Sequence, residues 1–411
     1  MHSKETVITA ATTPPSPILA FSGLRVFDAS QGLAGPYCAM LLAQHGATVI
    51  KLEPPQGDWS RGIGSRFGDQ SPLSISCNRG KHSLVIDLKQ PGATQAVQRA
   101  ASQCDVVLEG FRPGVAARLG LDYTELAAKR PGLIYASISG YGQDGPYSER
   151  PATDTVIQAF SGMMALNRDV EGRPSRVGFL VVDMTTGLYA FQAVSAALYA
   201  RLRGGPGQKL DISLMQAAAA LMSQRVVEMG LEGGEPQVFN APAGVYRSSD
   251  AWVAIALSNE DQFTALCTAL ERPDLRADPR YANFVERARH LAPLIEAVSQ
   301  TFLTRDTATW VQRINAAGGL ANPVLNLSQW SQDPHVQAVR AAPVTHWAPV
   351  GDFPLPRIPG AAEPLAGDPR ADWPTLGAAG AQSLETLGFS AEEIEDLRQR
   401  KILIEHGDSV R

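Results

Sequence analysis

Short apolar runs alternate with amphipathic stretches through the first third of the chain, and this alternation constrains the fold more than any other feature. Runs rich in β-branched residues predict strands at 24–28, 47–53, 83–88, 105–108 and 133–139. Between them, the spacing of apolar residues predicts helices at 34–45, 93–102 and 115–129. Strands and helices that alternate in this way form a parallel sheet with helices on both faces. We therefore expect an α/β fold with a Rossmann-like, doubly wound sheet.

The length of the chain, 411 residues, exceeds the usual size of a single core, so more than one domain is expected. Residues 1–18 are rich in Ser, Thr and Pro and are interpreted as a flexible N-terminal arm. Residues 19–229 and 335–411 are assigned to a large Rossmann-like domain. Residues 230–334 are assigned to a linker and a smaller α+β domain.

Local patterns refine this division in the later part of the chain. A short strand is expected at 209–213, followed by a helix at 214–229. In the smaller domain, 244–257 predicts a hairpin, and helices are expected from 261 to 317. Residues 341–380 are rich in Pro, Gly and Ala without clear periodicity, so they are expected to run over a surface. A capping box at Ser390 opens a last helix.

Charge, cysteine and histidine exclude several classes of function. A net charge of -5 gives no basic field, so no nucleic-acid partner is expected. The four cysteines are widely spaced without a CxxC pair and the histidines lack metal-ligand spacing, which predicts reduced thiols and no metal site. The most apolar stretch, 184–200, is interrupted by Thr, Gln and Ser, which favours a buried helix over a membrane span. A cytoplasmic protein without membrane association is expected.

A dinucleotide enzyme is the first alternative that a Rossmann-like sheet raises. Glu53, at the end of the second predicted strand, is suitably placed to contact a ribose hydroxyl. The first turn, from Gln31 to Pro36, lacks the G-x-G-x-x-G pattern, and Pro36 removes an amide from the helix end that would hold a pyrophosphate. The glycine pattern therefore disfavours a nicotinamide or flavin function.

One carboxylate stands where an apolar run meets a helical pattern. Asp183 follows the run 178–182, and Gly187 and Ala190 continue the helix at a spacing that allows close packing. Asp is a favoured N-cap residue, so these residues alone are compatible with a structural cap. A carboxylate can also act as a nucleophile, and the amides at a helix N-terminus are expected to favour the ionised form of Asp183.

Ten short motifs, taken in order, resemble the class III CoA-transferases, the family that includes formyl-CoA transferase, carnitine CoA-transferase and α-methylacyl-CoA racemase. They run from Gly23 to Val336, and the resemblance covers the chain from Gly23 to Leu403. The motifs are Gly23–Asp28, Ala34–Pro36, Gly46–Glu53, Gly57–Asp58, Asn78–Ser83, Asp87–Lys89, Glu109–Gly114, Gly140–Tyr147, Gly204–Gln208 and Asp333–Val336.

This resemblance implies a fold and a reaction. It implies an interlocked homodimer of ring-shaped protomers, each with a Rossmann-like large domain closed by the C-terminal segment. It also implies that Asp183 is the catalytic nucleophile, forming a mixed anhydride while CoA moves from an acyl-CoA donor to a free carboxylic acid. Coenzyme A is then a substrate, the second partner is a small carboxylic acid, and no tightly bound cofactor is expected.

The resemblance also assigns binding residues. The contacts to CoA match Lys89, Gly110, Phe111, Arg112 and Arg118. Each cation alone is equally well explained as a solvated surface charge, and Phe111 as ordinary packing. The substrate-binding positions are Gln31, Leu33, Ala34 and Asp154.

Departures from the family pattern bear on the alternatives. Leu33 replaces a Gln of formyl-CoA transferase, so formyl-CoA and oxalate are not expected as substrates. The His-Asp pair of the racemases falls at Thr153 and Asp154, and Thr cannot act as a base. A racemase or epimerase is therefore the second interpretation, and a non-catalytic acyl-CoA-binding protein the third.

Overall fold

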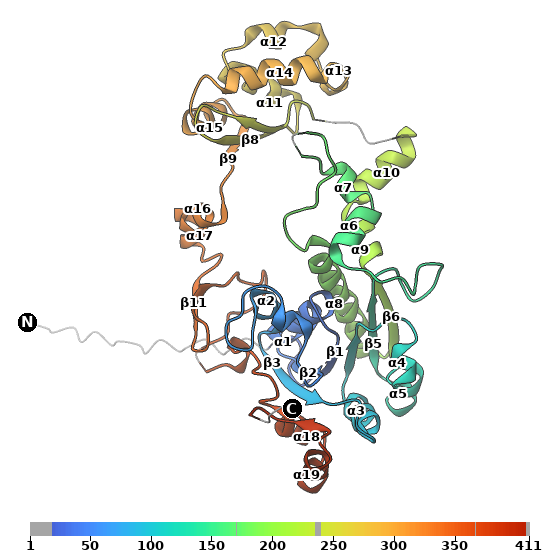
Figure 1. The fold of residues 1–411 in the computed structure, drawn as a ribbon. Helices are drawn as coiled ribbons and strands as arrows, with labels where there is room; N and C mark the ends of the chain where they lie inside the picture. The colour runs from blue at the N-terminus through green and yellow to red at the C-terminus, as the bar shows by residue number, and fades with distance from the viewer. Residues whose placement is uncertain (1–18, 170, 235–239, 366, 408–411) are drawn as a thin grey trace, which may run out of the picture. The chain divides into compact units, whose positions relative to one another are not determined.

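The computed structural model describes residues 19–169, 171–234, 240–365 and 367–407 (Figure 1). The N-terminal arm expected at 1–18 lies outside these residues. The described residues form two compact units. The first comprises those up to Ser223 and those from Val344 onward, and the second runs from Gln224 to Pro343. We propose that these units are the large and small domains expected from the sequence.

A seven-stranded sheet in the order β12-β3-β2-β1-β4-β5-β6 forms the centre of the first unit. Neighbours from β3 to β6 pair in parallel, and β12 pairs antiparallel with β3 at the edge. The predicted α/β class and Rossmann-like sheet are confirmed. The strands are β1 Arg25–Ala29, β2 Thr48–Glu53, β3 Lys81–Ile86, β4 Val106–Glu109, β5 Ile134–Ser139, β6 Gln208–Ser213 and β12 Leu403–Ile404.

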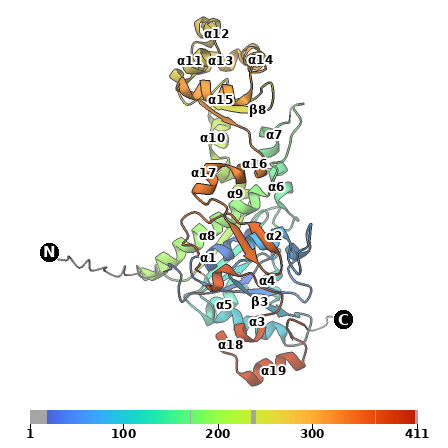
Figure 2. The same ribbon diagram turned by 90° about the vertical axis from the view of Figure 1, so that its left-hand side faces the viewer.

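Alternate strand residues supply two apolar layers, one on each face of the sheet. Val26 and Val106 face a layer that includes residues of α1, Ala34–Gln44, and α8, Val181–Leu202. Phe27 and Val107 face the other layer, with residues of α3, Ala93–Ser102, and α5, Tyr123–Lys129. The C-terminal helices α18, Gly380–Thr386, and α19, Ala391–Gln399, join that second layer and lie near the β3 end of the sheet (Figure 1, Figure 2).

Two predicted helices are interrupted in the structure. The segment 115–129 divides into α4, Val115–Arg118, and α5, because Gly120 adopts a φ of +60° and Asp122 caps a new helix. The segment 214–229 divides into α9, Leu214–Leu221, and α10, Ser223–Glu232, at Met222. Except for Ser223, α10 belongs to the second unit. The first unit contains in addition α2 Pro72–Asn78, α6 Asp154–Phe160, α7 Met163–Leu166 and 3-10 turns at Trp59–Gly62 and Pro369–Ala371.

The second unit combines a small antiparallel sheet with helices around its own apolar core. The predicted hairpin is confirmed as β7, Gly244–Arg247, and β8, Trp252–Ala256, and β9, Leu320–Pro323, adds a third strand. The helices are α11 Glu260–Ala269, α12 Pro273–Ala277, α13 Phe284–Arg289, α14 Leu291–Phe302, α15 Thr307–Ala316, α16 Leu327–Gln332 and α17 Pro334–Ala338, with a 3-10 turn at Pro279–Tyr281. No described helix has the length and apolarity needed to cross a bilayer.

The segment 341–380 contains a hairpin that the sequence pattern did not predict. Its strands are β10, Val344–Trp347, and β11, Gly351–Pro354. The rings of Trp347 and Phe353 lie 5.2 and 5.5 Å from the ring of Trp373, so aromatic packing holds the hairpin. The capping box at Ser390 is confirmed at the start of α19.

Candidate active site

Two turns meet at the carboxyl end of the sheet, where strand order reverses between β1 and β4. A Cβ atom added at Gly110, after β4, would lie 3.6 Å from Cα of Ser30 and 3.9 Å from the backbone nitrogen of Gln31, after β1. Ligands of open α/β sheets bind outside the carboxyl ends of the strands at such a reversal. The structure therefore brings two predicted binding residues, Gln31 and Gly110, 79 positions apart, to a ligand-binding edge.

Close packing of α8 on α1 places Asp183 beside the first of these turns. A Cβ atom at Gly187 would lie 2.7 Å from the carbonyl oxygen of Ala34 and 2.9 Å from Cδ1 of Tyr37. Asp183 lies four residues before Gly187, on the same side of the helix. The predicted nucleophile therefore lies near the start of α1, which carries Leu33 and Ala34.

Asp183 is not the N-cap of α8. The helix begins at Val181 with Leu180 as its cap residue, so Asp183 is the third helical residue. The first amides of α8 donate to another carboxylate. Oδ2 of Asp154 accepts hydrogen bonds from the backbone N–H of Val182 at 2.7 Å and of Asp183 at 3.1 Å. The simple structural explanation for Asp183, a cap, does not apply.

Asp154 is the first residue of α6 and is 2% exposed. Its Oδ1 accepts a hydrogen bond from Nε2 of Gln158 at 2.6 Å, and Oε1 of Gln158 accepts one from the backbone N–H of Val177 at 2.9 Å. Asp154 and Gln158 thus connect α6, the start of α8 and the segment before it. Both oxygens of Asp154 accept hydrogen bonds within the protein, and its contact with substrate stays a prediction.

The ionisation of Asp183 differs from the sequence-based expectation. Burial raises its pKa, and the nearby charge of Asp154 raises it further, from 3.8 to about 7. We expected the amides at the start of the helix to favour the ionised form of Asp183. That expectation is wrong in direction, because these amides donate to Asp154.

The predicted phosphate-binding cations are exposed at the surface. The side chains of Lys89, Arg112 and Arg118 are exposed and form no ion pair with any carboxylate in the described part of the chain. Lys89 lies beyond the end of β3, whereas Arg112 and Arg118 follow β4. Both groups follow the carboxyl ends of parallel strands, and β2 and β1 lie between these strands in the sheet.

The remaining predicted contacts differ in exposure. The ring of Phe111 packs against the apolar layer that contains α3 and α5, and its N–H donates to Oε2 of Glu109 at 2.8 Å. Leu33 and Ala34 are buried, and Gln31 is exposed. Leu33 provides no side-chain cap for α1.

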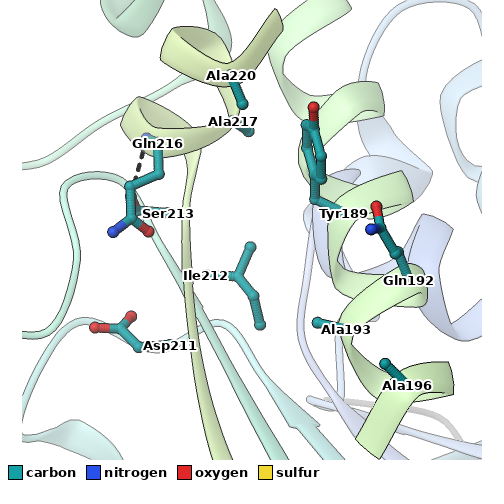
Figure 3. A pocket seen from close by; sticks show the side chains of 10 residues that line it. All are labelled: Tyr189, Gln192, Ala193, Ala196, Asp211, Ile212, Ser213, Gln216, Ala217 and Ala220. Carbon is teal, nitrogen blue, oxygen red and sulfur yellow. Dashed lines mark hydrogen bonds between the residues drawn. The ribbon is translucent and has the colours of Figure 1, made fainter.

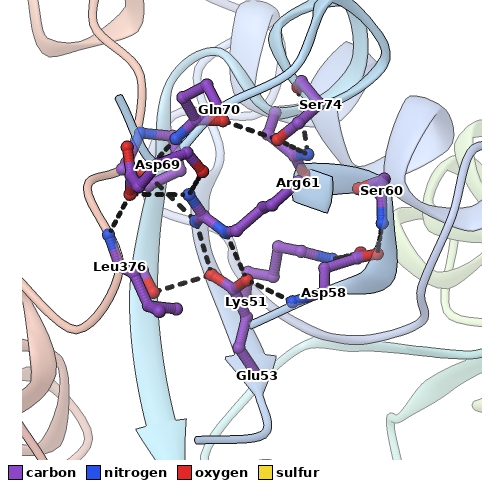
Figure 4. A network of polar contacts seen from close by, with 12 residues as sticks. Lys51, Glu53, Asp58, Ser60, Arg61, Asp69, Gln70, Ser74 and Leu376 are labelled. Atoms are coloured by element: carbon purple, nitrogen blue, oxygen red, sulfur yellow. Dashed lines mark hydrogen bonds and ion pairs between the residues drawn. The ribbon is translucent and has the colours of Figure 1, made fainter. Parts of the chain in front are cut away.

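A buried charge network that sequence reasoning missed holds the first turn in place (Figure 4). Asp58 accepts hydrogen bonds from the N–H of Gly32 at 3.1 Å and pairs with Nζ of Lys51 at 2.8 Å. Lys51 also donates to the carbonyl of Ser30 at 2.9 Å. The only sequence signal was the order Lys51, Glu53 and Asp58 in the family motifs, which assigned them no role.

Glu53 is used within the same network and does not point to a ribose. Its oxygens accept hydrogen bonds from Nε and Nη2 of Arg61, each at 2.7 Å, and from Oγ of Ser83 at 2.7 Å. Glu53 is fully buried. The structure therefore agrees with the glycine pattern in disfavouring a dinucleotide function.

A pocket of about 300 Å³ lies further along α8 (Figure 3). Tyr189 and Gln192 line it from α8, and Asp211 and Ser213 line it from β6. Ile212, Gln216 and four alanines of α8 and α9 form its remaining walls. Its first lining residue, Tyr189, follows Asp183 by six positions, and none of the predicted site residues lines this pocket.

Comparisons with known proteins agree with the motif order. A family model described as CoA-transferase family III matches residues 21–379. Acetyl-CoA:oxalate CoA-transferase from Acetobacter aceti is 36% identical over 335 residues, covering 80% of this chain and 86% of that protein. Succinate–glutarate CoA-transferase from Agrobacterium fabrum is 34% identical over 331 residues, covering 77% and 83%. The crystal structure of Rv3272 from Mycobacterium tuberculosis matches with a TM-score of 0.78 and 30% identity, covering 89% and 99%.

Proposed function

Because this chain belongs to CoA-transferase family III and is a transferase enzyme, we propose that it moves CoA from an acyl-CoA to a free carboxylic acid through a mixed anhydride on Asp183. The observation that carries this proposal is the position of Asp183. It lies one helical turn before Gly187, where α8 packs on the start of α1, and α1 follows β1 at the reversal in strand order.

In the proposed reaction the Asp183 carboxylate is first the nucleophile, then the carrier of the acyl group and finally the leaving group. The Asp183 carboxylate attacks the thioester carbonyl, the C–S bond breaks, and CoA leaves as the thiolate. The acceptor carboxylate then attacks the Asp183 carbonyl of this anhydride and displaces the donor acid, giving a second anhydride. The thiolate attacks the acceptor carbonyl, forms the new acyl-CoA and releases Asp183 as a carboxylate. No water is consumed, so the site must exclude water.

Three exposed cations support CoA as the substrate. A CoA molecule carries a pyrophosphate and a 3′-phosphate, and guanidinium groups bind phosphate oxygens with paired hydrogen bonds. We assign Lys89, Arg112 and Arg118 to these phosphates, and Gly110 and Phe111 to the turn that contacts CoA. Gln31, Leu33 and Ala34 are assigned to the acyl side of the site, and Asp154, whose oxygens are used within the protein, supports Asp183.

The relatives point to small dicarboxylic acids as acceptors. One is named for oxalate and another for succinate and glutarate. Oxalate was excluded above because Leu33 replaces a Gln, and a relative at 36% identity named for oxalate returns it to the acids to be tested.

The racemase interpretation remains the weaker one. Thr153 is exposed and precedes α6 as its cap residue. A hydroxyl of this kind does not titrate near neutrality, so the second base of a two-base reaction lacks a candidate at this position.

We also propose a homodimer in the cytoplasm. Large apolar side chains project from α8, with Tyr199 64% and Leu202 83% exposed, and a second copy would cover them. All four cysteines are buried and unpaired, in keeping with a reducing compartment. Light scattering in solution and cell fractionation measure these two properties.

The test of the function is to trap the intermediate. Incubation with an acyl-CoA and isotopically labelled hydroxylamine should leave a labelled hydroxamate on Asp183, because hydroxylamine attacks the aspartyl carbonyl and displaces the donor carboxylate. Peptide mass spectrometry detects this label, and CoA is released. Asp183→Asn should fold and lose transfer by at least about 10³-fold, because an amide cannot form the anhydride. Transfer at the wild-type rate in Asp183→Asn, or a label on another residue, would refute the assignment.

A further inference from the structure

Both oxygens of the Asp154 carboxylate accept hydrogen bonds within the protein. These bonds connect Asp154 to the start of α8, which carries Asp183, and to the segment before it. Oδ2 accepts from the N–H of Val182 and of Asp183 itself. Oδ1 is held by Gln158 at 2.6 Å, and Gln158 in turn holds the N–H of Val177. The contact between Asp154 and Val182 joins residues 28 positions apart and is buried.

We propose that Asp154 is a positioning residue that takes the amides at the start of α8, so that the carboxylate of Asp183 lacks their stabilisation and faces a second negative charge. This proposal rests on the proposed function, in which Asp183 is the nucleophile. Asp154 acts through Asp183 and has no direct part in bond making.

The consequence concerns the acylation step. An ionised Asp183 lies near the charge of Asp154 in a partly buried site, which makes the anion less stable and more basic. When Asp183 attacks the thioester, its negative charge leaves with the CoA thiolate and the aspartyl anhydride is neutral. The repulsion between the two carboxylates is relieved in that step, so Asp154 favours acylation.

Few other titratable groups lie on the elements that pack against α8 and could change the pKa of Asp183. Helix α8 packs against α1, α6, α9, β5 and β6. Of the titratable groups on these elements, only Asp154 changes the pKa of Asp183. The others are Tyr37 and Cys38 on α1, Tyr135 on β5, and Lys209 and Asp211 on β6, while α9 carries none.

The experiment measures the pH dependence of acylation in Asp154→Asn. CoA release in a single turnover should rise with pH in the wild type as Asp183 ionises, with a midpoint near its pKa of about 7. In Asp154→Asn the midpoint should move to lower pH by about 0.5 to 2 units, because the like charge is gone. Glu392→Gln, which removes an exposed acid from the first turn of α19, is the control and should leave the midpoint unchanged.

A second variant distinguishes the effect of the Asp154 charge on Asp183 from a loss of stability. In the double variant Asp154→Asn/Gln158→Glu, the new Asn keeps an oxygen for the two α8 amides and donates to the new Glu, which still accepts from Val177. Its melting temperature should recover relative to Asp154→Asn if that variant is destabilised, and its midpoint should lie between those of Asp154→Asn and the wild type.

The outcomes distinguish this inference from the proposed function. A wild-type midpoint in both Asp154 variants, with the label still on Asp183, overturns the inference and leaves the function intact. A label that never appears on Asp183 in the wild type overturns both. A lowered midpoint with the label on Asp183 supports both.

Discussion

Asp183 shows how a single side chain can be unfavourable for folding and necessary for chemistry. Its pKa is raised to about 7 by burial and by Asp154, whereas an unfolded chain would titrate it near 3.8. Between these two values the native protein binds a proton that the unfolded chain releases. The contribution of Asp183 to stability is therefore fully present below pH 3.8 and is lost as pH rises to about 7.

Asp183→Asn should consequently stabilise the protein at pH 8, where the wild type holds an unfavourable charge. A rise from 3.8 to about 7 corresponds to roughly 4 kcal/mol for a group wholly shielded from water. Asp183 keeps partial exposure, so we expect a gain of about 1 to 3 kcal/mol at pH 8 and little at pH 4. Melting temperatures of the two proteins across this range measure the effect.

Glu392→Gln is the matched control, because it also removes one acid from the first turn of a helix. Its difference from the wild type should stay nearly constant between pH 5 and pH 8. A Glu392→Gln curve that diverges as strongly as Asp183→Asn would mean that net charge, and not the local environment of Asp183, controls the pH dependence.

The sequence identified Asp183 through its motif but not the side chains that control it. A helical pattern and a preceding apolar run can be found locally. The hydrogen bond from Val182 to Asp154 spans 28 residues and depends on how α6 meets α8. For the same reason, the pairing of Asp58 with the N–H of Gly32, 26 residues away, had no local signal.

At the scale of elements, the approach of α8 to α1 depends on Gly187. A methyl group there would meet a backbone oxygen of Ala34 at 2.7 Å and the ring of Tyr37 at 2.9 Å. Backbone atoms cannot turn aside as a flexible side chain can, so the helices would have to separate. Helix α8 carries Asp183 one turn away, which links this packing to the site.

Gly187→Ala should therefore destabilise the protein by about 1 to 3 kcal/mol, although alanine favours a helix by about 1 kcal/mol. Acylation of Asp183 should slow at the same time. Gly230→Ala in α10 is the control, because nothing lies within 4 Å of its added methyl group, and it should be neutral or stabilising. Equal melting temperatures and equal acylation rates for both variants would show that the close packing of α8 on α1 at Gly187 affects neither stability nor acylation.

Strands and helices could be predicted from the sequence where a short stretch of residues determines them. The strands β1 to β6 and helix α3 follow from alternating apolar runs and match the structure within about two residues. The hairpin of β10 and β11 was missed, because its residues alternate poorly and its stability comes from packing of Trp347 and Phe353 on Trp373. The break before α5 had a local signal in Gly120 and Asp122 that the longer helical pattern obscured.

At the scale of the first unit, buried polar contacts join the sheet to the C-terminal segment. Arg61 pairs with Glu53 and donates to the carbonyl of Pro374 at 3.1 Å, 313 residues away. Gln70 donates to the same carbonyl at 2.9 Å, and the N–H of Leu376 donates to Asp69 at 2.8 Å (Figure 4). No sequence pattern relates residues so distant, although the family resemblance implied that the C-terminal segment closes this domain.

Arg61→Ala tests whether this buried network holds the C-terminal segment against the sheet. Glu53 is buried, which by itself raises its pKa, but the hydrogen bonds and charge of Arg61 lower the pKa to about 2. Loss of Arg61 leaves a buried anion, and we expect a loss of about 3 to 5 kcal/mol at pH 7. The contribution of Glu53 is present above pH 4.5 and is lost as pH falls toward 2, so the difference should shrink in acid.

Arg99→Ala is the comparison, because Arg99 also joins the early part of the chain to the C-terminal segment but lies at the surface. It pairs with Glu393 while both side chains are more than 40% exposed, and it lies over the ring of Phe389. We expect a loss of about 1 kcal/mol or less, nearly independent of pH above 4. Urea denaturation at pH 7 and pH 3 measures both variants. If the two lose equal stability at pH 7, the C-terminal segment is held by apolar packing of α18 and α19, and the charges around Arg61 have no special part in closing the domain.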